Sequence, residues 1–184
     1  MIDLTPAARR TAALLTAVPD GALGGPTPCE EYTLGDLVHH VGGLSLAFTW
    51  AATKDPRSAE SGGPMGDGSR LEEDWRELYA ARLADLAEAW RSPEAWTGMT
   101  RAGGVDLPGE VAGLVALNEV VVHGWDVARA TGRPYEITRE EAEACLAFAA
   151  QASEVFGPPV DVPEDASPLD RLVARTGRDP RWTP

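Results

Sequence analysis

Glu119, His123 and Asp126 are the side chains of this sequence whose types and spacing best suit chemistry. Spacings of four and three residues place all three on one helix face, within about 60° of arc. The surrounding segment, LVALNEVVVHGWDVA, is apolar on nearly all sides, which is typical of a buried helix. An isolated buried carboxylate is costly, so it must be paired, protonated or bound to a metal.

A second helix must supply any further ligand, because the other two histidines of the chain are His39 and His40. Leu37, Val41 and Leu44 belong to the apolar stripe of their segment. At about 100° per residue, His40 lies roughly 70° from the centre of that stripe and His39 roughly 170°. We therefore expect His39 to face water and His40 to lie at the core edge, where a neighbouring helix packs.

Two interpretations of these residues compete. In one, Glu119 or Asp126 belongs to a buried polar network, paired with an arginine or with His123. In the other, His40, Glu119 and His123 bind one divalent metal ion, as facing helices of bundles often do. Two histidines and one carboxylate leave coordination positions open for water or substrate. This ligand set suits zinc, nickel or iron(II) and does not select firmly among them.

Asp126 has two candidate roles beside such a site. Its carboxylate could accept the second ring N–H of His123 and so fix the orientation of that ligand. Alternatively, it could form a salt bridge to Arg129, one turn away. A metal ion here would lower the pKa of a coordinated water or thiol and so supply a nucleophile near neutral pH.

The segments that must position these residues are predicted to be long helices. Apolar and polar residues almost never alternate with period two, as they would in strands. This pattern predicts one all-α bundle domain over residues 1–184. Residues 55–70, rich in Gly and Pro, predict a flexible loop, and residues 157–184 a Pro-rich tail. Residues 96–107, around Gly103-Gly104, can form a small hairpin. The helices are expected at 7–18, 33–53, 71–91, 108–130 and 138–156, with a short one at 168–175.

Composition narrows the classes of function. The net charge of −13 is opposite to the basic footprint of a nucleic-acid-binding protein. No stretch approaches the ~20 apolar residues of a membrane span, and the first residues lack the apolar run of a signal peptide. Cys29 and Cys145 are far apart and predict two reduced thiols. We therefore expect a cytoplasmic protein with no nucleic-acid or membrane partner.

Two segments resemble the signature sequences of a known family. EYTLGDLVHHVGG (residues 31–43) and NEVVVHGWDVARATG (residues 118–132) are similar to segments of the mycothiol-dependent maleylpyruvate isomerase N-terminal family, which belongs to the DinB-like superfamily. PLDRLVARTGRDP (residues 168–180) resembles the end of a compact metal-binding subgroup of it. The resemblance implies a DinB-like four-helix bundle that holds a divalent metal, often zinc, on His40, Glu119 and His123. It also implies a low-molecular-weight thiol, mycothiol or bacillithiol, as cofactor.

This chain departs from the family pattern in two respects. Tyr32 stands where the family commonly has tryptophan. The isomerases of the family carry an additional C-terminal domain, and this sequence ends soon after the bundle, so isomerisation of maleylpyruvate itself is not expected.

Three functions follow as hypotheses. The first is a metal- and mycothiol-dependent transferase or isomerase that joins a small thiol to an electrophilic substrate. The second is a non-enzymatic bundle that binds a metal or a small ligand in a stress response. The third is a structural interaction bundle without an ion. A homodimer through an exposed helix face is compatible with all three.

Overall fold

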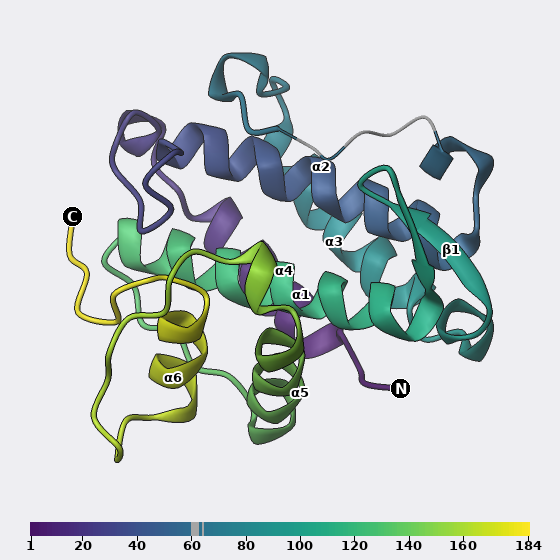
Figure 1. Ribbon diagram of the computed structural model, residues 1–184. Coiled ribbons are helices and arrows are strands. Elements are labelled where there is room, and N and C mark those ends of the chain that lie inside the picture. Colours follow the sequence, from purple (N-terminus) through teal and green to yellow (C-terminus); the bar gives the residue numbers. More distant parts are fainter. Residues whose placement is uncertain (60–62, 64) are drawn as a thin grey trace.

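The computed structural model describes residues 1–59, 63 and 65–184, and within them the chain is mainly helical (Figure 1). The expectation of an all-α fold is confirmed, and a small antiparallel hairpin forms around Gly103-Gly104 as predicted. The helices are α1 (Thr5–Thr16), α2 (Leu34–Thr53), α3 (Trp75–Ala89), α4 (Gly109–Ala130), α5 (Arg139–Gln151) and α6 (Pro168–Arg175), and the strands are β1 (Met99–Ala102) and β2 (Val105–Pro108).

Helices α1 to α4 form the bundle. Each packs on two others, with α1 against α3 and α4, and α2 against α3 and α4. Leu15, Leu37, Leu83 and Leu117, one from each helix, are fully buried between them. Helices α5 and α6 pack on each other and lie beside α4, on the side away from α2 (Figure 1). Both helices are therefore additions to the four-helix core.

Helix α4 is the central element. It contacts α1, α2 and α5, and most of its residues are buried. By length and composition alone, it is the one helix in the described part of the chain that could cross a membrane. Because 78% of its apolar window is buried inside the fold, the apolar sequence is explained by packing. A polar side chain on α4 is therefore placed directly in or beside the core.

Local signals in the sequence fix where α2 begins and ends. Thr33 caps the helix by accepting the Asp36 N–H, and the Asp36 carboxylate accepts the Thr33 N–H in return. Lys54 ends the helix in the left-handed region, with φ of 54°. The start of α2 sets the rotational position of His40 against α4.

Two predicted helices are longer than the observed ones. The segment expected at 71–91 becomes helical only at Trp75, because Leu71 is extended, with ψ of 128°, and the next residues form a turn. The segment expected at 138–156 ends at Gln151 and continues as a short 3₁₀ turn, which brings Phe156 onto Phe148 with ring centroids 6.2 Å apart. Residues 60–62 and 64 of the loop expected at 55–70 lie outside the described residues.

Candidate metal centre

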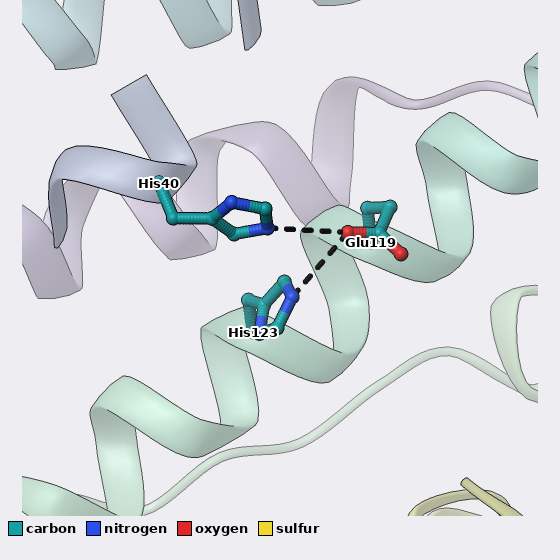
Figure 2. A group of neighbouring side chains, drawn as sticks. All are labelled: His40, Glu119 and His123. Atoms are coloured by element: carbon teal, nitrogen blue, oxygen red, sulfur yellow. Dashed lines mark ion pairs between the residues drawn. The ribbon is translucent and has the colours of Figure 1, made fainter. Parts of the chain in front are cut away.

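Helices α2 and α4 bring His40, Glu119 and His123 together (Figure 2). Glu119 Oε2 lies 3.5 Å from His40 Nε2 and 3.3 Å from His123 Nε2. One ligand atom from each residue lies within 4.8 Å of the other two. The side chains are largely covered, with exposed fractions of 13%, 27% and 10% for His40, Glu119 and His123. The three side chains that the sequence singled out therefore lie together, and metal binding by them stays a prediction.

The separations of Glu119 from the two histidines fit a shared divalent ion. Zinc bonds of about 2.0–2.2 Å in a tetrahedral site place neighbouring ligand atoms about 3.3–3.6 Å apart. The observed separations of 3.3 and 3.5 Å agree with those edges. They also exceed the usual donor–acceptor distance of a direct N–H···O hydrogen bond, about 2.7–3.2 Å. The two imidazoles meet edge to face, with ring centroids 4.8 Å apart, so both nitrogens can point to one position.

The negative charge of Glu119 also favours a cation in the cluster. Burial acts to lower the pKa of His123, but the neighbouring carboxylates of Asp126 and Glu119 outweigh it and raise that pKa to about 9. Burial acts to raise the pKa of Glu119, yet the two histidines together hold it well below its ordinary value. The carboxylate thus stays ionised and requires a proton or a metal ion between itself and the imidazoles.

Asp126 fixes the orientation of His123. The His123 Nδ1 atom lies 3.0 Å from Asp126 Oδ2. Burial acts to raise the pKa of Asp126, but Arg178 and His123 together hold it below its ordinary value, so the group is an ionised acceptor. An ionised carboxylate only accepts hydrogen bonds, so His123 Nδ1 carries the proton and Nε2 is directed at Glu119. This is the arrangement that orients histidine ligands in metal sites.

Arg178, which the sequence reasoning missed, completes this chain of contacts. Its Nε lies 3.0 Å from Asp126 Oδ1 and its Nη2 lies 2.9 Å from Oδ2. The alternative prediction, a salt bridge from Asp126 to Arg129, is wrong. Arg129 instead donates a hydrogen bond to the Pro180 carbonyl at 2.6 Å. Both arginines thus hold the C-terminal segment against α4. The signal for Arg178 was present in the TGRDP segment of the tail, but its partner is 52 residues away.

His39 differs from the prediction that it faces water. It is half-buried, and its Nδ1 accepts the Asp67 N–H at 3.2 Å. The neighbouring Gly66 N–H donates to the Tyr32 hydroxyl, whose ring lies 5.4 Å from that of His40. Sequence periodicity could not show this contact, because it depends on the loop after α2 folding back onto the start of that helix.

A pocket of about 280 Å³ opens beside the cluster. His40 and Glu119 form one end of it, and the hairpin and the apolar side chains of α2 and α4 form the rest. An ion held by three protein ligands would keep at least one open coordination position, and this pocket gives it a neighbouring space for a bound molecule.

Comparisons with known proteins point to one family. The model of the mycothiol maleylpyruvate isomerase N-terminal domain matches residues 4–128. Two uncharacterized proteins of Mycobacterium tuberculosis, MT0763 of strain CDC 1551 / Oshkosh and Rv0738 of strain ATCC 25618 / H37Rv, are each 31% identical over 179 residues, which covers 92% of this chain and 92% of theirs.

Two solved structures share the fold. The crystal structure of the mycothiol-dependent maleylpyruvate isomerase aligns with a TM-score of 0.58 and 23% identity, over 79% of this chain and 66% of that one. A histidine-to-alanine mutant of a mycothiol-dependent maleylpyruvate isomerase aligns with a TM-score of 0.57 and 20% identity, over 85% of this chain and 71% of that one. This chain thus spans about two thirds of the length of the solved enzyme.

The contact between Arg178 and Asp126 predicts a large loss of stability when the arginine is removed. Arg178→Met leaves a buried charge with only His123 to compensate it, and the free energy of unfolding should fall by about 3 kcal/mol or more. Arg181→Met is the matched control, because Arg181 lies three residues on and pairs with Asp179 at the surface. That change should cost less than about 1 kcal/mol.

Urea unfolding followed by circular dichroism measures both changes. Asp126→Asn combined with Arg178→Met should recover part of the loss, because the uncompensated charge is then absent. Equal effects of Arg178→Met and Arg181→Met would show that the buried contact contributes little.

Proposed function

Since the chain belongs to the mycothiol maleylpyruvate isomerase N-terminal domain family, we propose that it is a metal-dependent enzyme that joins a small thiol of the mycothiol type to an electrophilic substrate. The observation that carries this proposal is the position of Glu119 Oε2, which lies 3.3–3.5 Å from the Nε2 atoms of both His123 and His40. His40, Glu119 and His123 would hold the ion, with zinc as the first candidate.

The ion has one chemical task in this proposal: a bound divalent cation lowers the pKa of a coordinating thiol and keeps it as thiolate near neutral pH. Asp126 and Arg178 keep the His123 ring in the orientation that ligation needs. Glu119 contributes one negative charge, so the three protein ligands leave a net positive charge for an anionic thiolate. The neighbouring pocket would hold the electrophile beside it.

The cysteines of the chain are poor sources of that thiolate. Burial raises the pKa of Cys29 to about 11 and that of Cys145 to about 12, so both are protonated at neutral pH. Both are free thiols and neither belongs to the cluster of His40, Glu119 and His123. A separate thiol cofactor is therefore the chemically reasonable nucleophile.

The reaction that fits these parts is an S-transfer or S-addition. The thiolate sulfur forms a bond to an electron-poor carbon. In substitution a leaving group departs with the electron pair of its bond, and in addition a π bond breaks and the adjacent carbon takes a proton from water. Isomerisation of maleylpyruvate is not carried over from the solved enzyme, because this chain spans about two thirds of its length.

Removal of any one ligand should abolish tight metal binding. Protein prepared without chelator should contain one ion per chain by elemental analysis. His40→Ala, Glu119→Ala and His123→Ala should each lower the affinity more than about 100-fold, since changes to outer-shell partners alone cost about 10- to 100-fold. His39→Ala is the matched control, because it removes an adjacent histidine outside the cluster and should retain the ion. Retention of the ion by all three ligand variants would refute the site.

Metal affinity should rise with pH. The pKa of His123 is about 9 in the metal-free protein, so at pH 7 its imidazole is protonated and must lose a proton to bind an ion. Affinity should therefore increase from about pH 6 to pH 9 and level off above that range. Asp126→Asn should move the plateau to lower pH, because it removes one of the two carboxylates that raise this pKa.

Competition with a chelator across this range, corrected for the protonation of the chelator, measures the pH dependence. A flat profile would show that protons and metal do not compete for His123.

Thiol binding can be tested separately from turnover. In protein loaded with cobalt(II), addition of mycothiol should produce a thiolate-to-cobalt charge-transfer band, and an S-methylated mycothiol should not, because it lacks an ionisable thiol. Consumption of mycothiol with dimethyl maleate then reports catalysis. A bound ion with neither the band nor turnover would leave the non-enzymatic metal-binding alternative as the function.

A further inference from the structure

The two faces of the hairpin differ in chemistry. Cross-strand neighbours share a face, and the register pairs Thr100 with Leu107 and Ala102 with Val105. This face turns to the bundle, because the Thr100 hydroxyl donates to the Ala51 carbonyl of α2 at 2.6 Å. The opposite face carries Arg101 and Asp106, whose side chains pair at 3.4 Å and are 39% and 68% exposed. The charged residues of the hairpin thus point away from the bundle.

The inner face of the hairpin borders the pocket beside His40 and Glu119, although Val105 at its tip is 63% exposed. Ala102, Val105 and Leu107 line it from the hairpin, and the remaining walls are apolar side chains from two helices. Leu44, Ala47 and Phe48 come from α2, and Val115 from α4. Val115 lies one helical turn before Glu119, so the apolar wall continues directly into the ligand cluster.

Away from the ligand cluster, the described walls of the pocket offer no partner for an anionic substrate. Among the described residues that line it, the groups that can bear charge are His40 and Glu119, both at the end where the ion would bind. A carboxylate placed against the apolar walls would lose its hydration without a compensating partner, which is costly. The net charge of −13 further disfavours the approach of a dianion.

We propose that this pocket selects a small, uncharged, largely apolar electrophile and rejects dicarboxylates. This inference rests on the proposed function, in which the positive charge of the ion is used by the thiolate. A volume of about 280 Å³ is at the lower end of the range for small-molecule sites, about 300–1,000 Å³, so the pocket fits a single ring or a short chain. Val115 and the inner face of the hairpin are the residues that determine specificity.

Direct binding of a matched pair of probes tests the proposal without any reaction. Methyl phenyl sulfone and benzenesulfonate have the same shape and differ in charge, and a sulfonate is a weak metal ligand. Ligand-observed NMR titrations on the metal-loaded protein saturated with mycothiol should give a dissociation constant at least about tenfold lower for the sulfone. Equal or tighter binding of the sulfonate, or absence of sulfone binding, would overturn the inference.

Substitutions on α4 locate the binding. Val115→Arg should weaken the sulfone and strengthen the sulfonate by about tenfold each, because it places a guanidinium in the wall. Leu114→Arg is the matched control: Leu114 is equally half-buried but lines a different surface of α4, and both affinities should be unchanged. Val115→Thr, which keeps the shape and adds a hydroxyl, should weaken the sulfone even if Val115→Arg does not fold.

The results separate this inference from the proposed function. Sulfone binding that depends on Val115, together with no thiolate-to-cobalt band, would support the apolar pocket and refute the thiol chemistry. A thiolate band and turnover of maleate in preference to dimethyl maleate would support the thiol chemistry and refute the apolar selectivity. Identical effects of Val115→Arg and Leu114→Arg would also refute the assignment of the pocket.

Discussion

Glu119 lies with one carboxylate oxygen between two imidazole nitrogens, at the point where α2 crosses α4. An ionised oxygen in this position requires positive charge within a few ångströms, because burial removes most of its hydration. A proton on His123 meets the requirement in the free protein, and a divalent ion meets it with better geometry for three ligands. In the proposed site, a proton and a metal ion would therefore compete for one position. The packing of α2 on α4 creates that position, and Asp126 and Arg178 orient His123 beside it.

The C-terminal segment belongs to this arrangement. Asp126 is fully buried, and its charge is balanced from two sides, by His123 on its own helix and by Arg178 from the segment after α6. Docking of the tail is thereby coupled to the orientation of His123, a proposed metal ligand. A change that loosens the tail removes a charge partner of Asp126, and among the described residues His123 then carries more of the compensation, which raises the pKa of its ring. Tail and ligand orientation cannot vary independently.

The sequence predicted what depends on local geometry. Spacing along one helix was enough to place Glu119, His123 and Asp126 on one face, and the apolar stripe of α2 was enough to place His40 at the edge of the core. What it missed depends on segments far apart in the chain. Arg178 was not found because its partner lies 52 residues away, and His39 was wrongly placed in water because a loop returns to cover it. Periodicity indicates the direction in which a side chain points from its own helix. It does not indicate which distant segment of the chain packs against that side chain.

The residues proposed to bind the metal and the residues that shape the pocket come partly from different elements. The ligand cluster is built only from α2 and α4, while the hairpin contributes to the pocket and to none of the three ligands. Because strand residues alternate between faces, the hairpin can carry Arg101 and Asp106 toward solvent and still present an apolar surface to the bundle. A one-residue shift in its register would exchange those faces and turn charged side chains toward the pocket. Substitutions in a four-residue strand could therefore change whether the pocket prefers charged or uncharged substrates. The residues proposed to hold the metal and activate the thiol would stay the same.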